Sequence, residues 1–142
     1  MLVVRPYSHK IVRSIHKTFK VYFFDNGDVL NGEGPRFENF IAAHLIKRCH
    51  FLKDYTGANW ELHFLRDREQ REVDFAIICD GKIIELIEVK LSDDHFSTGF
   101  MHLIGKINPQ KATQIILNGN HDYKKGNLYK TDPFDYFAKS IW

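Results

Sequence analysis

Residues 72–90 place charged side chains within two stretches that otherwise have the composition of buried β-strands. Two apolar runs, residues 75–78 and 83–87, flank an Asp-Gly turn sequence, so the pattern predicts a β-hairpin. An isolated ion inside a sheet costs several kcal/mol unless it is paired or holds a metal. Asp74, Glu88 and Lys90 are therefore the candidate functional residues of this hairpin.

Two of these residues are predicted to share a face of the sheet. Side chains alternate along a strand, so Glu88 and Lys90 point one way and Val89 points the other. Whether Asp74 joins Glu88 and Lys90 depends on the length of the turn at Gly81.

The sequence permits two turns. A two-residue turn, Asp80 and Gly81, would place Asp74 opposite Ile87 and on the wrong face. A three-residue loop, with Gly81 in the left-handed region, would place Asp74 on the face of Glu88, within reach of a shared metal ion. A compensating β-bulge would have the same effect as the longer loop.

The residue types suit metal-assisted chemistry. Asp74 and Glu88 would repel each other, and a divalent cation removes that repulsion. Mg²⁺ (or Mn²⁺) prefers oxygen ligands, which the two carboxylates and the backbone carbonyl of Val89 would supply. The ion would stabilise charge on a scissile phosphate, and Lys90 would orient water or neutralise the phosphate. The alternative is a surface aspartate and an ordinary Glu-Lys pair at a strand end.

An aspartate followed one strand later by Glu-x-Lys resembles the PD-(D/E)XK superfamily of metal-dependent nucleases. The remaining pattern predicts strands at residues 2–7, 20–25, 60–66 and 112–117, and helices at residues 35–52, from Ser92-Asp93-Asp94 to Ile104, and from Pro133. Pro6 favours an edge position for the first strand. Because both faces of the central hairpin are apolar, we expect an α/β fold with a central mixed sheet flanked by helices, in one domain over residues 1–142. The resemblance to PD-(D/E)XK nucleases implies that this α/β/α arrangement is restriction-endonuclease-like.

Glu38 is a third candidate carboxylate. We expect it in the first turn of the helix over residues 35–52, where the helix dipole alone favours an acid. The functional alternative places it over the strand ends. His44 and His102 are interpreted as solvated or core histidines. A phosphate-contacting patch and a solvated turn are both open for Arg66, Arg68 and Arg71.

Composition sets broad limits. A 142-residue chain with 44% hydrophobic residues has room for one core, and its net charge of +2 gives no global signal for nucleic acid. Two cysteines are too few for a disulfide framework, and no apolar run is long enough to span a membrane. We therefore expect a cytoplasmic location and no membrane partner.

A more specific resemblance rests on four blocks of the sequence in order. These blocks are residues 20–27, 37–45, 66–75 and 87–90. Together they resemble the nuclease-like C-terminal domain of unknown function found in prokaryotic AAA-type P-loop ATPases. The resemblance spans residues 2 to 117 and implies catalytic roles for Glu38, Asp74, Glu88 and Lys90, a Mg²⁺ (or Mn²⁺) cofactor and a DNA substrate.

The departures from that family leave two hypotheses. The chain contains no GxxxxGK[ST] motif, so any ATPase would act in trans, and Met1 lies close to the expected domain start, as in a stand-alone version or a piece of a longer protein. Gln110 and Gln114 are weak candidates for the glutamine that some relatives carry on a helix. The chain is then either a metal-dependent DNA nuclease or a non-catalytic assembly or regulatory module that pairs with itself or with an ATPase.

Overall fold

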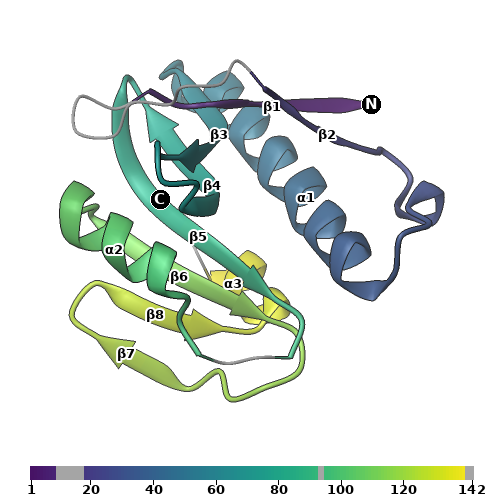
Figure 1. Ribbon diagram of the computed structural model, residues 1–142. Helices are drawn as coiled ribbons and strands as arrows, with labels where there is room; N and C mark the ends of the chain where they lie inside the picture. The colour runs from purple at the N-terminus through teal and green to yellow at the C-terminus, as the bar shows by residue number, and fades with distance from the viewer. Residues whose placement is uncertain (9–17, 93–94, 140–142) are drawn as a thin grey trace.

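An eight-stranded mixed sheet forms the centre of the computed structural model, which describes residues 1–8, 18–92 and 95–139 (Figure 1). The strands are β1 (Leu2–Pro6), β2 (Lys20–Tyr22), β3 (Trp60–Arg66), β4 (Glu72–Cys79), β5 (Lys82–Lys90), β6 (Lys111–Ile116), β7 (Tyr123–Lys125) and β8 (Leu128–Thr131). The helices are α1 (Glu33–Thr56), α2 (Thr98–Ile107) and α3 (Pro133–Lys139), with a short 3₁₀ turn, η1 (Asn26–Asp28).

The strands lie in the order β2-β1-β3-β4-β5-β6-β8-β7. The consecutive strands β3, β4 and β5 are antiparallel, and β6 and β8 continue the sheet parallel to β5. The predicted edge position of β1 is wrong, because β1 pairs with both β2 and β3. Pro6 is tolerated because β2 pairs with residues 2–4 of β1 only, so that, among the described strands, Pro6 pairs with β3 alone and its other side is open as at an edge. The pattern also missed β7 and β8, which have only three and four residues; β7 is also fully exposed.

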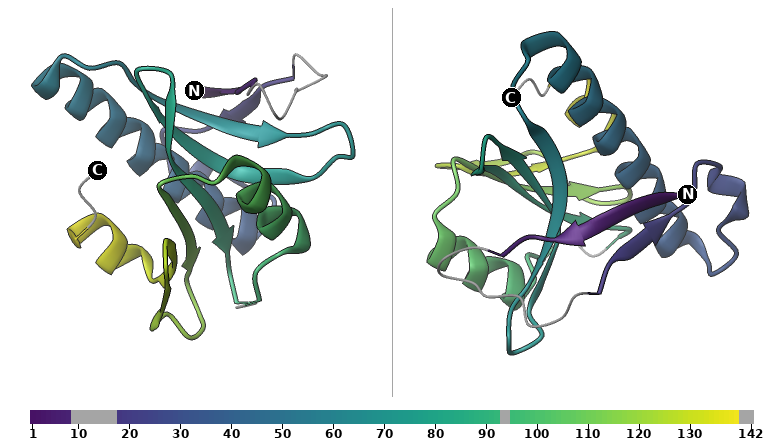
Figure 2. Two further views of the ribbon diagram at one scale, coloured as in Figure 1. Left: turned by 90° about the vertical axis from the view of Figure 1, so that its left-hand side faces the viewer. Right: turned by 90° about the horizontal axis from the view of Figure 1, so that it is seen from above.

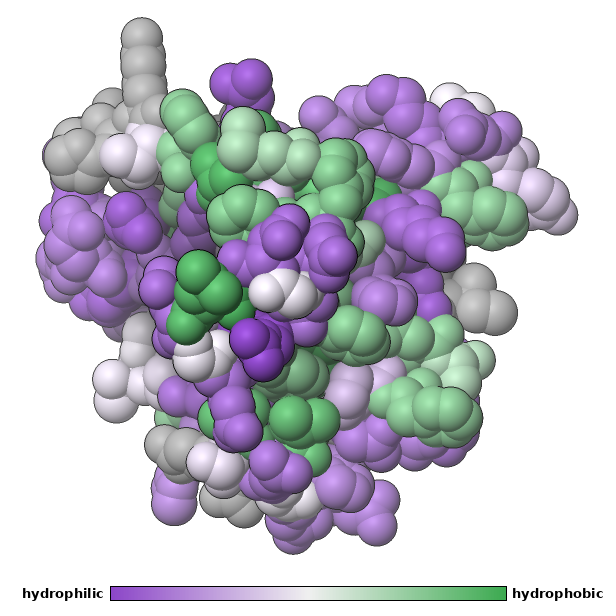
Figure 3. All heavy atoms as spheres, turned by 90° about the vertical axis from the view of Figure 1, so that its right-hand side faces the viewer, coloured by the Kyte–Doolittle hydropathy of each residue, from purple (hydrophilic) through white to green (hydrophobic). Residues whose placement is uncertain are grey.

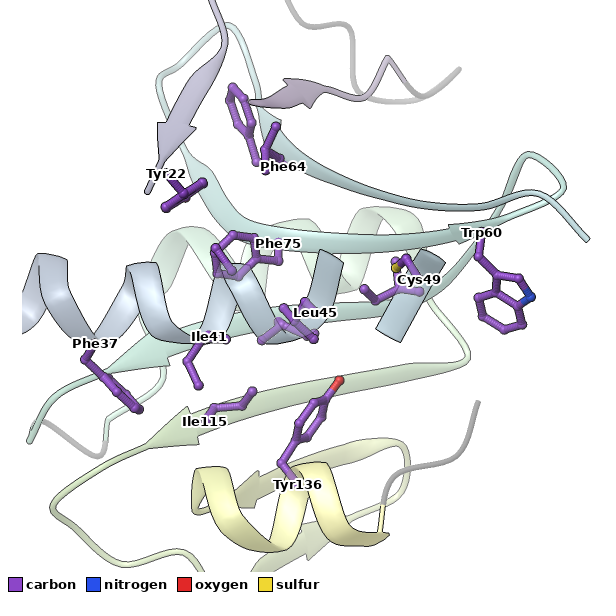
Figure 4. Packing of buried hydrophobic residues seen from close by; sticks show 14 residues of the cluster. Tyr22, Phe37, Ile41, Leu45, Cys49, Trp60, Phe64, Phe75, Ile115 and Tyr136 are labelled. Atoms are coloured by element: carbon purple, nitrogen blue, oxygen red, sulfur yellow. The ribbon is translucent and has the colours of Figure 1, made fainter. Parts of the chain in front are cut away.

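The helices cover both faces of the sheet (Figures 1 and 2). One apolar cluster joins α1 and α3 to the sheet and includes Ile41, Phe75 and Tyr136 (Figure 4). The other cluster joins α2 to the opposite face and includes Leu86 and Phe100. The predicted α/β class, with a mixed sheet between helices, is confirmed.

The helix boundaries differ from those predicted. The first helix is longer than residues 35–52 and ends at Gly57, whose left-handed backbone (φ 74°) donates its N–H to the Lys53 carbonyl. The second begins at Thr98, because Ser97 accepts the Phe100 N–H and caps it. The predicted start at residue 92 is therefore wrong, and residues 93–94 of that prediction lie outside the described residues. Pro133 opens α3 as predicted.

A buried carboxylate ties α3 to the sheet. Glu85 is fully buried on β5 and accepts hydrogen bonds from the hydroxyls of Thr113 and Tyr136, the latter at 2.8 Å. The Lys111 ammonium lies 3.5 Å from the same carboxylate. This polar contact between β5, β6 and α3 supplements the apolar packing of Tyr136.

The β4–β5 hairpin has the two-residue turn. Asp80 and Gly81 both have left-handed backbones (φ 47° and 76°), and Cys79 pairs with Lys82. The register then shifts by one residue, which leaves Ile84 as the extra residue of a bulge on β5. The three-residue loop does not form. The bulge at Ile84 instead shifts the register by one residue, so that Phe75 pairs with Ile87.

Polar and apolar side chains are interspersed over the face on which η1 and the start of α1 lie (Figure 3). Phe24 and Leu30, on the connection between β2 and α1, are 74% and 86% exposed. No helix among the described residues is long and apolar enough to cross a membrane.

The backbone conformations of Gly81, in the turn, and Gly105, in α2, predict opposite effects of alanine substitution on stability. Gly81→Ala should lower the free energy of unfolding by about 1 kcal/mol, because alanine disfavours the left-handed region. Gly105→Ala, in the interior of α2 with no heavy atom within 4 Å of an added Cβ, should raise it by about 0.5–1 kcal/mol. Urea denaturation measures both, and an unchanged stability of Gly81→Ala would contradict the left-handed turn.

Candidate functional site

Asp74 lies in a second bulge, where β4 passes β3. The β3–β4 pairing shifts by one residue at Phe64, which faces both Asp74 and Phe75. Bulges redirect side chains from the regular alternation. The Asp74 Oδ2 atom accepts a hydrogen bond of 2.8 Å from the backbone N–H of Val89. The bulge thus directs this carboxylate toward the backbone of β5.

Glu88 is the neighbour of Asp74 across the hairpin, yet its carboxylate has other partners. Phe75 pairs with Ile87, so Asp74 and Glu88 are the next residues on their strands. Glu88 is 5% exposed and accepts hydrogen bonds from the Ser97 N–H, at the start of α2, and from the side-chain amide of Gln114. Within the described ranges the two carboxylates share no hydrogen-bond partner.

Glu38 approaches Asp74 from α1. The helix begins at Glu33, so Glu38 lies in its second turn and the prediction of a first-turn position is wrong. The dipole effect fades after the first turn and does not explain this acid. The Glu38 Oε1 atom accepts a hydrogen bond of 2.7 Å from the Tyr22 hydroxyl. Its charge is close enough to Asp74 to raise the pKa of that carboxyl.

Lys20, on β2, is the cation of this acidic cluster. Its Nζ atom lies 3.4 Å from Glu38 Oε1 and 2.5 Å from Glu72 Oε1. Burial lowers the pKa of Lys20, but its contacts with Glu38 and Glu72 outweigh burial and raise it overall. Lys20 and Glu72 could not be recognised as site residues from the sequence, because only the fold brings the Lys20 side chain into contact with Glu38 and Glu72.

The electrostatic environment of Asp74 leaves its protonation balanced near neutral pH. Burial, and then the negative charge of Glu38, raise the pKa of Asp74 to about 7. The Val89 N–H and the Lys20 ammonium act in the opposite direction. A carboxyl in this state would gain from a further positive charge nearby.

Lys90 is the candidate cation on β5. It ends β5, two residues after Glu88, and makes no ion pair with any residue that the structure describes. Two of the three arginines for which a phosphate-contacting patch and a solvated turn were both open have acidic partners: Arg66 binds Glu72 and Arg71 binds Asp67. His44 and His102 are exposed, as expected for solvated histidines.

Gln114 is a further residue of this region, on β6 rather than on a helix. It is fully buried and pairs with Glu88 across β5 and β6. Its Oε1 atom has no hydrogen-bond partner among the described residues. A buried unsatisfied oxygen costs about 1–3 kcal/mol. The sequence signal that could have identified Gln114 is a polar amide in the middle of an otherwise largely apolar strand.

The candidate metal ligands are all oxygen atoms, which suits Mg²⁺ or Mn²⁺. They include Asp74, whose pKa the charge of Glu38 raises and which accepts the Val89 N–H, and Glu88, which is hydrogen-bonded to Gln114. Across residues 1–8, 18–92 and 95–139, no group of three or more His, Cys, Asp or Glu side chains is arranged to hold a metal ion. A bound ion would therefore need the backbone and water to complete its coordination.

The fold and site define a mixed α/β domain with buried acids at one end of its central hairpin. The chain belongs to the family described as a domain of unknown function, DUF4143, whose model matches residues 33–135. No curated protein matches the chain, and neither does any solved structure. The sequence resemblance to a domain of unknown function is confirmed by this family match. The match says nothing about nuclease activity.

The raised pKa of Asp74 makes the stability of the fold depend on pH. A folded pKa of about 7, above the ordinary aspartate value of 3.8, contributes stability that is complete below pH 4 and lost as pH rises to 7. Asp74→Asn keeps an acceptor for Val89 but carries no charge. It should be more stable than wild type at pH 8, by up to about 4 kcal/mol, with the difference vanishing toward pH 4. Denaturation across pH measures this, with exposed Asp54→Asn as control; a pH-independent difference would contradict it.

Lys20→Met tests the cation of the cluster. Loss of the ammonium removes the cation beside Glu38 and leaves Glu72 with Arg66 alone, so the pKa of Asp74 should rise further. The fold should lose about 2 kcal/mol at pH 8, and less at pH 4 where the acids are protonated. Carboxyl NMR titration and denaturation measure the two effects, with Lys47→Met on α1 as control. An unchanged Asp74 pKa would exclude this coupling.

Proposed function

We propose that this domain is a divalent-metal-dependent phosphodiesterase acting on DNA, with Glu38, Asp74, Glu88 and Lys90 as its catalytic residues. The observation that carries the proposal is the buried Asp74 carboxyl, whose pKa of about 7 reflects burial beside Glu38. Such a pair is stabilised by a cation. The order Glu on α1, Asp on β4 and Glu-x-Lys on β5 supports the proposal, because it follows the order that the PD-(D/E)XK resemblance implies.

Each residue has a role that its surroundings support. A bound Mg²⁺ or Mn²⁺ would stabilise charge on the phosphate and activate water. Asp74 and Glu88, with the Val89 carbonyl, supply oxygen ligands, and Glu38 is the auxiliary carboxylate. Lys90 has no ion-pair partner in the described chain, so its ammonium is free to contact a phosphate.

The second candidate function is a non-catalytic assembly or regulatory module associated with an AAA-type ATPase in trans, or with a second copy of the chain. Two observations favour it. Lys20 already neutralises Glu38 and Glu72 without a metal, and protein donors bind both oxygens of Glu88. DUF4143 domains are commonly found in AAA-ATPase-associated proteins, which is consistent with such a partner.

Calorimetric titration with Mn²⁺ and a DNA cleavage assay separate the two functions. The phosphodiesterase predicts weak Mn²⁺ binding that Asp74→Asn reduces at least about tenfold. It also predicts slow, Mn²⁺-dependent cleavage, because binding of the DNA backbone needs more cations than this site presents. Lys90→Ala should abolish cleavage and leave the fold intact, whereas Lys82→Ala, exposed at the far end of β5, should not affect cleavage.

Cleavage that survives both Lys90→Ala and Asp74→Asn would assign the activity to another site or to a contaminant. If Mn²⁺ neither binds nor supports cleavage, the phosphodiesterase is excluded. Binding of an ATPase or self-association in that case would favour the assembly module.

A further inference from the structure

Gln114 has an unusual place in the sheet. It lies in the middle of β6, fully buried, in a strand whose other buried positions include Ala112, Ile115 and Ile116. A primary amide carries two N–H donors and one carbonyl oxygen, so burying it requires partners on both ends.

Both donors of the amide have partners. Its Nε2 atom lies 3.1 Å from Glu88 Oε2 and 2.9 Å from the backbone carbonyl of His95. The opposite orientation of the amide would set its oxygen against these two acceptors, so hydrogen-bond chemistry fixes which end faces Glu88. Gln114 thus links the β5 carboxylate to the turn before α2.

The oxygen of the amide, Oε1, is buried and has no hydrogen-bond partner within the part of the chain that the structure describes. Buried carbonyl oxygens almost always have a protein or water donor. The atom is therefore suited to bind a water molecule or a cation. It belongs to the same amide whose nitrogen donates to Glu88.

We propose that Gln114 is the positioning residue of Glu88: one amide N–H holds the carboxylate, the other anchors the amide to the His95 carbonyl, and its oxygen accepts a hydrogen bond from water that accompanies a divalent cation. This inference rests on the proposed function and extends it to β6. Ser97 supplies the other constraint on Glu88, since its N–H donates to both carboxylate oxygens at 3.3 and 3.4 Å. Residues that orient a metal ligand typically change metal affinity 10–100-fold.

Two variants of Gln114 and one control test the role by Mn²⁺ calorimetry. Gln114→Met removes the donors and the oxygen and should weaken Mn²⁺ binding about tenfold. Gln114→Glu places a carboxylate beside Glu88, so it should lower the metal-free melting temperature through repulsion. It should nevertheless bind Mn²⁺ at least as tightly as wild type, because it adds an oxygen ligand. Gln110→Met, at an exposed glutamine just before β6, should match wild type in both measurements.

A purely structural role predicts instead that affinity follows stability, with Gln114→Glu weakest in both. That result, or a Gln114→Met variant that binds Mn²⁺ within about twofold of wild type, would overturn the inference alone. Wild-type protein that binds no Mn²⁺ would overturn the proposed function and this inference together.

The metal-free wild-type protein provides a test without any variant. The side-chain amide protons of Gln114 should exchange with solvent at least about 100-fold more slowly than those of exposed Gln110, because Glu88 and His95 hold them. Equal exchange rates, measured by NMR, would show that the amide does not position Glu88.

Discussion

A central hairpin buried on both faces must neutralise every acid that it carries, and much of the structure follows from how it does so. Glu85 is satisfied by hydroxyls from β6 and α3 and by Lys111. Glu88 is satisfied by the start of α2 and by Gln114. Asp74 depends on the Val89 N–H and on Lys20. The partners of the buried acids thus come from both sides of the hairpin. The helices and strands that pack against the hairpin must therefore also bring the groups that neutralise its acids.

The three acids differ in how completely the protein satisfies them. Glu85 has two hydroxyl donors and the Lys111 ammonium beside it, which leaves little for a ligand and is typical of a structural ion pair. Asp74 has a pKa near neutrality, and Glu88 adjoins an amide with an unpartnered oxygen. The incomplete neutralisation is therefore confined to the end of the hairpin where the candidate site lies, and this asymmetry favours a site over a uniformly structural role.

The sequence predicted the fold class and most of the elements from periodicity and turn residues. The strand at Trp60–Arg66 agrees with its prediction at both ends, because apolar alternation and the flanking polar turn coincide there. The position of Asp74 was less accessible, since two single-residue bulges, at Ile84 and beside Phe64, determine its direction. Bulges depend on tertiary packing and leave no regular pattern in the sequence. For the same reason Lys20, about fifty residues away from Asp74 in the chain, was not recognised as its neighbour.

The family match begins at residue 33, whereas β1 and β2 precede it. All the candidate acids therefore belong to the matched region, whereas Lys20, the cation near Glu38, Glu72 and Asp74, does not. β1 also covers the edge of β3, whose backbone would otherwise be open to pairing with another strand. The segment before the family domain thus performs two tasks at once: it closes the sheet and sets the charge of the site. A protein that carries the same domain behind a different N-terminal segment would inherit the acids with a different electrostatic balance, and with it a different affinity for cations.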